Sequence, residues 1–303
     1  TKARQHFAET GGNFSIANDY LRQLVQAWLH KGNPKSYPKF ERAVEEKLSR
    51  FLCNRSGSHI CALRNCYSFP KELLEILVHE LTLAVDGMAD ALHVSDDLFE
   101  EWWSNDTLDE RFGAKIDFFK QPCVGRNVFI NPPIVNSIEN DEMILKIIEK
   151  INLDLTHEAP TRFLLVIPRT LEQNSPYNKA QESNLMEIAR FADKSFAFTR
   201  PQDFWDSKGI TEQFDGEISL FLCVNKESLS RDPIDWTNFV KKLKGWMLKN
   251  GGSESLLIRN TLITSFENED HQDANLELEP GYIHPKTTRH YSDSLMELKM
   301  IIG

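Results

Sequence analysis

Apolar residues in the first part of the chain recur at the spacing of amphipathic helices. Two groups each share one helical face: Leu21, Leu24, Val25 and Trp28, and further on Phe40, Val44, Leu48 and Phe51. Pro38 separates the two groups, and proline interrupts a helix that has already begun. We therefore expect a small helical unit over residues 18–52.

A longer apolar pattern follows Pro70, a residue well suited to the entrance of a helix. Its members repeat with the period of an α-helix and are Leu73, Leu74, Leu77, Val78, Leu81, Ala84, Val85 and Met88. This pattern predicts a helix that packs against a sheet. The acidic stretch Ser95 to Arg111 predicts a helix and a loop, and its paired Trp102 and Trp103 favour a place in the core over a ligand platform.

Beyond residue 111 short apolar runs alternate with helical ones, which is typical of a mainly parallel sheet covered by helices. The predicted strands are Asn127 to Ile130, Phe163 to Ile167, Ser195 to Phe198, Ile218 to Val224 and Leu256 to Leu262. The predicted helices are Glu142 to Ile151, Leu185 to Phe191 and Trp236 to Leu248. The polar, acidic stretch Glu267 to Asp273 predicts a loop. The chain is thus expected to have an α/β fold, with a helical module over residues 1–69 and an α/β domain over residues 70–303.

Composition narrows the class of protein. The 303 residues are 41% hydrophobic, contain no run long enough for a membrane helix, and begin without the apolar core of a signal peptide. We expect an intracellular protein with no membrane partner. The five cysteines are expected to be reduced thiols, and Cys53, Cys61 and Cys66 with His59 lack the paired spacing of a zinc module, so no metal site is expected.

The net charge of −10 hides an asymmetry along the chain. Residues 1–70 carry 11 Lys or Arg against 5 Asp or Glu, whereas the remainder carries 24 against 40. The N-terminal module is therefore where we expect a contact with RNA or another polyanion, with a merely solvated helical surface as the alternative.

One tetrapeptide combines features that suit catalysis. Asn131-Pro132-Pro133-Ile134 directly follows the predicted strand Asn127 to Ile130, and ligands of open α/β sheets bind at the ends of strands. Two prolines stiffen the loop, and the Pro132 carbonyl and the Asn131 side chain both offer acceptors. Two such acceptors can hold both hydrogens of an exocyclic amine and direct its lone pair at an electrophilic methyl group, so that catalysis is mostly orientation. The alternative is a stiff turn that only ends a strand.

Several blocks in order resemble the phosphorylated-CTD-interacting factor family, the cap-specific adenosine-N6 methyltransferases of messenger RNA. These blocks are Phe112-Gly113, 19 positions before Asn131, then Phe129 to Pro133, Phe163 to Pro168 and Ser219 to Asn225. The similarity covers roughly residues 70–226 and is weaker in the helical part before it.

The resemblance implies a Rossmann-like methyltransferase fold preceded by a small helical module, with S-adenosylmethionine as cofactor, the capped 5′ end of an RNA as substrate, and a nuclear location. It implies that Asn131 and Pro132 bind the amine in a catalytic loop that continues through Pro133 and Ile134. Phe112 and Gly113 would lie near the cofactor, and Pro168 would line the pocket. Asp109, Glu110 and Asp117 are the nearest acids for the cofactor ribose, or else solvated surface charges.

The chain departs from the family pattern in two places. Ile134 stands where the family has an aromatic residue that stacks on the base, and the stretch Gln202 to Gly216 lacks basic character. The Gly-x-Gly cofactor turn usual in Rossmann methyltransferases is absent before Asn131, but the family resembled does not rely on one. A second hypothesis is therefore a protein of methyltransferase fold without catalysis, acting as an RNA-binding or protein-interaction subunit. A third keeps the enzyme but takes DNA or a protein glutamine as substrate.

Overall fold

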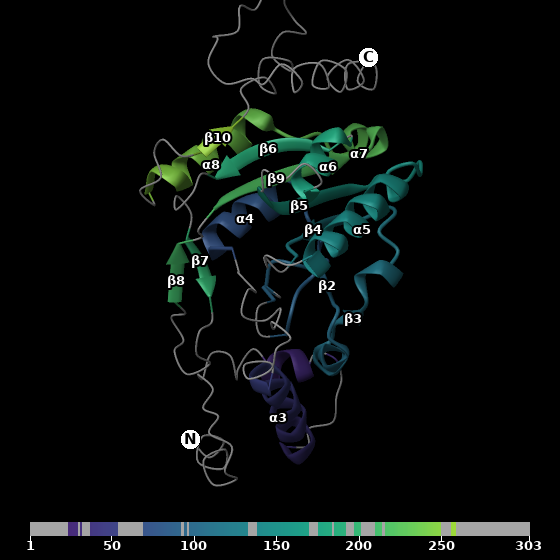
Figure 1. Ribbon diagram of the computed structural model, residues 1–303, viewed down its shortest axis with the longest axis vertical. Coiled ribbons are helices and arrows are strands. Elements are labelled where there is room, and N and C mark those ends of the chain that lie inside the picture. The colour runs from purple at the N-terminus through teal and green to yellow at the C-terminus, as the bar shows by residue number, and fades with distance from the viewer. Residues whose placement is uncertain are drawn as a thin grey trace, which may run out of the picture.

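The computed structural model describes residues 24–29, 31, 37–53, 69–91, 94–95, 97–132, 138–169, 175–183, 185–191, 197–200, 210–213, 216–249 and 256–258. These residues form a mixed α/β fold in which helices cover both faces of one twisted sheet (Figure 1). A separate hairpin of β7 (Ala197–Arg200) and β8 (Ile210–Gln213) lies beside it. None of the described helices combines the length and the apolar character that crossing a membrane requires.

The main sheet has eight strands in the order β10-β6-β9-β5-β4-β1-β2-β3. Their bounds are β1 Val85–Asp86, β2 Glu101–Ser104, β3 Lys115–Ile116, β4 Asn127–Ile130, β5 Arg162–Arg169, β6 Met186–Phe191, β9 Glu217–Val224 and β10 Leu256–Ile258. Strands β5, β4, β1, β2 and β3 are mutually parallel. Strand β9 runs antiparallel to both of its neighbours, β5 and β6, so β6 points the same way as β5. The sheet is therefore mixed and mostly parallel.

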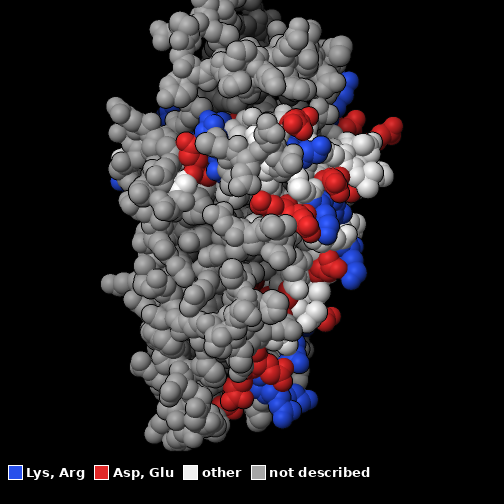
Figure 2. Space-filling model, in the orientation of Figure 1, with Lys and Arg blue, Asp and Glu red and all other residues white. Residues whose placement is uncertain are grey.

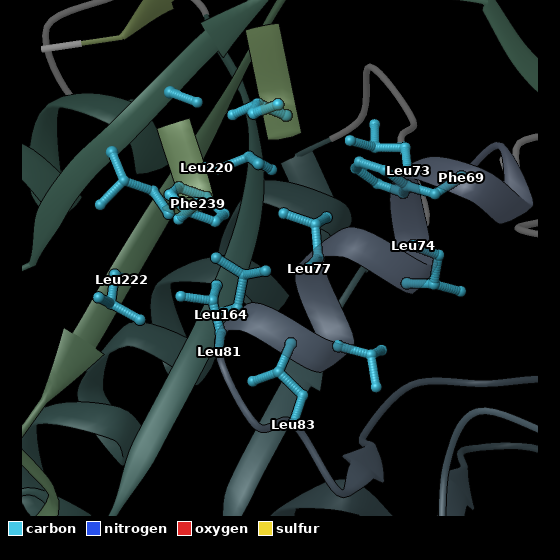
Figure 3. Close-up of a cluster of buried hydrophobic side chains, with 14 of the residues drawn as sticks. Phe69, Leu73, Leu74, Leu77, Leu81, Leu83, Leu164, Leu220, Leu222 and Phe239 are labelled. Atoms are coloured by element: carbon cyan, nitrogen blue, oxygen red, sulfur yellow. The ribbon is translucent and has the colours of Figure 1, made fainter. Parts of the chain in front are cut away.

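One face of the sheet is covered by α4 (Lys71–Glu80) and α8 (Trp236–Lys249). Figure 3 shows the side chains between them: Leu73, Leu77 and Leu81 of the α4 segment and Phe239 of α8 pack on Leu164, Leu220 and Leu222 of the sheet. All of these side chains are almost completely removed from solvent. Burial of each such side chain stabilises the fold by about 1.5–3 kcal/mol.

The opposite face is covered by α5 (Ile138–Asp154) and α6 (Pro176–Glu182). Ile144, Ile147, Ile148 and Ile151 of α5 form one apolar face against the sheet. Because strand residues alternate between faces, neighbours such as Val128 and Phe129 belong to different cores.

Three short helices lie in the connections between these elements. They are α7 (Lys226–Arg231) and two 3-10 helices, η2 (Thr107–Phe112) and η3 (Phe118–Lys120).

The N-terminal helices form a third core at the β2 end of the sheet. The helical segment 24–29 and α3 (Tyr37–Cys53) bury Leu24, Trp28, Phe40 and Val44 against Trp102 and Phe112. Pro38 lies in the first turn of α3, where a proline does not cost a hydrogen bond. In Figure 1, α3 lies below β2 and β3, apart from the helices that cover the two faces of the sheet. The helical unit thus packs directly on the part of the sheet that β2 contributes.

Three elements differ from the sequence prediction. The helix after Pro70 ends at Glu80, and Val85 and Asp86 form strand β1 instead of a further helical turn. Trp102 and Trp103 lie in strand β2, not in a helix or loop, although both are buried as predicted. Residues 186–191 form strand β6 rather than a helix, because they pair with both β9 and β10.

The other predictions agree with the structure where it describes the residues. Strands β4, β5, β9 and β10 and helices α5 and α8 occur where the pattern predicts them, and strand β7 overlaps the predicted strand Ser195 to Phe198. Cys123 and Cys223 are free, buried thiols. The side chains of Cys53, Cys61, Cys66 and His59 and the stretch Glu267 to Asp273 lie outside the described residues.

Candidate functional site

The candidate site lies at the carboxyl edge of the parallel strands, where β1 and β4 are neighbours. From β1 the chain continues to β2 on one side, whereas β4 pairs with β1 on the other side. The strand order therefore reverses between β1 and β4. In open α/β sheets, ligands bind outside the carboxyl ends of the strands at such a point.

The turn Asp86-Gly87-Met88 leaves β1 at this edge. Asp86 is paired in register with Phe129 of β4 and Trp102 of β2, so its side chain lies on the same sheet face as these two aromatic residues. Its Oδ1 accepts a hydrogen bond from the backbone N–H of Met88 at 3.3 Å. Burial raises the pKa of Asp86 to about 7, and the bond from Met88 offsets only part of this effect. Asp86 is thus a buried carboxyl that titrates near neutral pH.

Gly87 allows β1 to approach β4 closely. Its backbone N–H donates to the Phe129 carbonyl at 2.7 Å. A Cβ at this position would lie 2.9 Å from Val128 Cγ1 and 3.2 Å from the Phe129 oxygen. The turn therefore requires glycine for lack of space, and not because of a positive φ angle.

A second polar group lies beside this turn and consists of Lys47, Asp90, Asp106 and Asp109. Lys47 Nζ, supplied by α3, lies 2.5 Å from Asp90, 2.9 Å from Asp106 and 2.6 Å from Asp109. Asp90 follows β1, Asp106 follows β2, and Asp109 lies in η2. We call these four residues the Lys47 cluster. It joins the helical module to the ends of both strands.

Burial and the charges of the neighbouring groups together set the pKa values in the Lys47 cluster. Burial alone would lower the pKa of Lys47, but the three carboxylates, Asp90 foremost, raise it above its ordinary value. The pKa of Asp109 is raised to about 7 by burial and then by the charge of Asp90, against the opposite effect of Lys47. Ser104 Oγ also donates to Asp109 at 2.7 Å. One ammonium thus faces three carboxylates, and the cluster carries excess negative charge when all are ionised.

The three carboxylates also have the spacing of a metal site, with one oxygen of each within 4.8 Å of the others. A divalent cation bound there would need the position that Lys47 Nζ takes, within 2.9 Å of all three. The ammonium supplies the positive charge that such an ion would bring. The cluster is therefore an internal ion-pair network in this structure.

The sequence-predicted catalytic residues lie at the same edge as far as they are described. Asn131 and Pro132 follow the last residue of β4, and Asn131 is half-buried. Since Asp86 pairs with Phe129, the start of this loop lies two residues beyond the position level with Asp86. Pro133 and Ile134 lie outside the described residues, as does the stretch Gln202 to Gly209 with Phe204, Trp205 and Asp206.

The predicted cofactor residues are distributed around this edge. Pro168 is next to last in β5, where it pairs with Ile218 of β9. Phe112 is buried against Trp28 of the helical module, and Gly113 ends η2 with a φ of 106°. Asp109 is fully buried, so the alternative of a solvated surface charge is wrong for it.

Asp117 and Glu110 fit the surface interpretation better. Asp117 forms an ion pair with Lys120, and a hydrogen bond from that ammonium lowers the pKa of the carboxyl. Glu110 is exposed in η2. Neither belongs to the Lys47 cluster.

Asp86, Asp106 and Lys47 are residues of this edge that the sequence pattern did not predict. The sequence did contain a signal for Asp86 and Asp106. Asp106 stands 20 positions after Asp86, and in dinucleotide-binding folds a similar spacing separates the first turn from the acid that binds the ribose. The apolar residues up to Val85 fit a helical period, so the sequence predicted a helix at Asp86. The first turn of a dinucleotide-binding fold follows a strand, and the predicted helix therefore hid the significance of this spacing. No local pattern marks Lys47, whose nearest partner in sequence is 43 residues away.

A cavity of about 670 Å³ lies at the opposite, amino edge of the sheet. It is lined by residues around the starts of β1, β2 and β4, among them Glu101, Arg126 and Asn127, and by Arg231 and Asp232 at the end of α7. Acids and bases are mixed there, and Arg126 is already paired with Glu101 at 3.1 Å. Ligands of open α/β sheets bind at the carboxyl ends of the strands, whereas this cavity lies at the amino ends. We therefore place the candidate site at the carboxyl edge, where the buried carboxylates and the Asn131 loop lie.

Comparison with known proteins found no protein-family model and no curated protein that matches the chain. The function is therefore inferred from the residues of the site.

Proposed function

We propose that the protein is an S-adenosylmethionine-dependent methyltransferase that acts on the exocyclic N6 amine of adenosine in RNA. The observation that carries this proposal is the strand order. The order β3-β2-β1-β4-β5-β6 is that of a doubly wound dinucleotide-binding sheet, with the reversed β9 inserted between β5 and β6. The Rossmann-like methyltransferase fold that the resemblance implies belongs to this doubly wound class of sheet.

The residues at the ends of β1 and β2 fit the cofactor. A carboxylate after the second strand of such a sheet accepts hydrogen bonds from ribose hydroxyls, and Asp106 occupies that position with a side chain that is 19% exposed. Asp86, in the turn after β1, offers a carboxyl to the α-ammonium group of the cofactor. The excess negative charge of the Lys47 cluster complements a ligand that carries a sulfonium and an ammonium group. When bound, the cofactor supplies an electrophilic methyl group.

The loop after β4 suits the other substrate. The Asn131 side-chain oxygen and the Pro132 carbonyl accept hydrogen bonds from the two amine hydrogens, which leaves the nitrogen lone pair directed at the methyl carbon. Transfer of the methyl group to the nitrogen would release S-adenosylhomocysteine, and the extra proton on the nitrogen would pass to solvent water. Asn131 and Pro132 act by orientation and need no change of protonation state.

We assign adenosine in a capped RNA as the substrate on two grounds. The chain resembles the cap-specific family, and residues 1–70 carry a net positive charge, which suits contact with RNA phosphates. On the described part of the face in Figure 2, acidic and basic side chains are intermingled. We therefore assign the RNA contact to the catalytic edge and to the helical module, and not to the surface as a whole. A nuclear location and a protein partner belong to the same proposal.

The first experiment is calorimetric titration of the whole protein with S-adenosylmethionine and with S-adenosylhomocysteine. One-to-one binding, followed by methylation of a capped RNA that begins with adenosine, is the expected result. A folded protein that binds neither ligand would overturn the proposal and favour the non-catalytic RNA-binding or protein-interaction subunit.

Two asparagines of β4 and its loop then test the catalytic assignment. Asn131→Ala should abolish methyl transfer while cofactor binding and the unfolding temperature stay unchanged. Asn127→Ala is the matched control at the other end of the strand, where the side chain donates to the Thr82 carbonyl at 2.9 Å. Normal turnover by Asn131→Ala would disprove its role. Mass spectrometry of the product separates RNA from DNA and from protein glutamine.

A further inference from the structure

Lys47 is a buried lysine that the helical module contributes to the edge of the sheet. Its side chain is 1% exposed, and a lysine is seldom buried this completely unless it is paired. Lys47 connects the ends of β1 and β2, because it pairs with Asp90 after β1 and with Asp106 after β2. These are the two strand ends that bear the carboxylates proposed to bind the cofactor. The module is therefore part of the edge itself.

Asp106 is held from two sides. Its Oδ1 accepts the backbone N–H of Leu108 at 3.0 Å, which caps η2, and its Oδ2 accepts from Lys47 at 2.9 Å. Its side chain is 19% exposed, compared with 10% for Asp90 and 0% for Asp109. Of the three carboxylates, Asp106 is therefore the one most accessible to a ligand.

Removing the ammonium would leave three carboxyl groups within 4.8 Å of one another. Like charges this close raise the pKa of one another and drive the most exposed member outward. Asp90 and Asp109 are enclosed, so Asp106 is the side chain that can rotate away. Lys47 thus fixes the orientation of the Asp106 carboxylate.

We propose that Lys47 is a positioning residue of the cofactor site, which holds the Asp106 carboxylate ready for the ribose hydroxyls of an S-adenosyl ligand. This inference rests on the proposed function and adds to it a role for the helical module. The module then serves cofactor binding as well as any contact with RNA. Lys47 itself touches neither substrate nor reacting atoms.

The test compares Lys47→Met and Lys47→Arg with the unchanged protein. Lys71→Met is the control, because it removes a lysine from an exposed ion pair with Asp97. The binding of S-adenosylhomocysteine is measured by calorimetry at pH 6, 7 and 8, after circular dichroism has shown that each variant is folded. We expect Lys47→Met to weaken binding at least tenfold at pH 7, and Lys47→Arg to restore most of the affinity.

The pH profile separates positioning from a merely structural role. Among the described residues, the charged groups that face Asp106 are Lys47 from α3, Asp90 from the turn after β1 and Asp109 from η2. Arg111 and Glu46 form an ion pair at the exposed rim of the contact between α3 and η2. Without the ammonium, the three carboxyl groups of the cluster should retain a shared proton up to higher pH, so the affinity of Lys47→Met should rise from pH 6 to pH 8. Asp86, with its pKa of about 7, contributes a rise that the unchanged protein and Lys71→Met share, so the readout is the additional rise in Lys47→Met.

The outcomes are distinguishable. If the unchanged protein does not bind S-adenosylhomocysteine, the proposed function fails and this inference fails with it. If it binds and a folded Lys47→Met binds equally well with the same pH profile, only this inference is overturned. Should Lys47→Met not fold, the double variant Lys47→Met/Asp109→Asn removes one of the repelling charges, and its affinity should still be reduced. Full affinity in that variant would also overturn the inference.

Discussion

Asp86 combines two properties that seldom occur together, a buried carboxyl and a place in the candidate binding edge. Its raised pKa of about 7 means that the folded protein keeps a proton that the unfolded chain releases near pH 4. The free energy of unfolding contributed by this group is therefore fully present below pH 4 and falls as pH rises through 7. A buried ionisable group that lowers stability at a ligand site is typical of residues retained for function.

Asp86→Asn should stabilise the protein at pH 8 and weaken its binding of S-adenosylhomocysteine. The amide is neutral at every pH and still accepts the Met88 N–H, so the cost of ionising a buried group disappears. The stability gain over the unchanged protein should grow between pH 5 and pH 8 by on the order of 2–4 kcal/mol. Urea unfolding at both pH values measures it. A gain that is equal at both would mean that Asp86 does not titrate in this range.

Gly87→Ala tests the close approach of β1 and β4. Its new methyl group would lie 2.9 Å from Val128 Cγ1 and 3.3 Å from Phe118 Cδ2, in a fully packed core. We expect a loss of about 1–3 kcal/mol in the free energy of unfolding, measured by urea denaturation. An unchanged midpoint would show that β4 can shift at no cost.

At the scale of residues, the position of the Asn131 loop could be predicted from the sequence but the buried charges could not. Asn131 and Pro132 lie at the end of β4 as expected, because the motif is contiguous and directly follows a clear strand. Lys47 could not, because it is one lysine of an ordinary amphipathic helix. Its three partners lie 43, 59 and 62 residues away and come together with it only when α3 packs on the sheet.

At the scale of elements, the wrong predictions share a physical cause. At both β1 and β6 the apolar residues also fit a helical period. Strand β1 has only two residues, too few to show a period of its own, and Leu185, Ile188 and Ala189 recur at helical spacing just before and within β6. Val85 also falls into the helical period of α4, although Thr82, with a φ of 50°, already marks the end of that helix in the structure. The long helices α5 and α8 were predictable because each has one exposed face and one buried face.

Helix α8 contains a glycine whose replacement by alanine should have the opposite effect on stability to that of Gly87→Ala. Gly245 lies inside α8, and a Cβ there would meet no other atom within 4 Å. Gly245→Ala should therefore raise the free energy of unfolding by about 0.5–1 kcal/mol, because alanine loses less backbone entropy than glycine in a helix. Thermal unfolding monitored by circular dichroism measures it, and a decrease would reveal a clash that the structure does not contain.

At the scale of the whole molecule, the strand order could not be predicted from the pattern of the chain. The pattern gives the strands and their approximate sequence but not which of them are neighbours. The reversal between β1 and β4 and the insertion of β9 depend on pairings between distant segments, such as Val85 with Val128 and Leu165 with Phe221. The site is created by this order, because it brings the turn after β1 beside the loop after β4.

The same order predicts where a bound cofactor protects the molecule. Saturating S-adenosylhomocysteine, at about 100 times its dissociation constant, should stabilise the folded state by about 2.7 kcal/mol. In hydrogen exchange the slowing should fall on three segments at the carboxyl edge, residues 85–91, 101–109 and 127–132, and on α3 through Lys47. Residues 228–232 beside the cavity at the amino edge serve as the internal control and should not change. Protection of residues 228–232 alone would move the ligand to that cavity, because a ligand slows exchange mainly where it closes local openings of the chain.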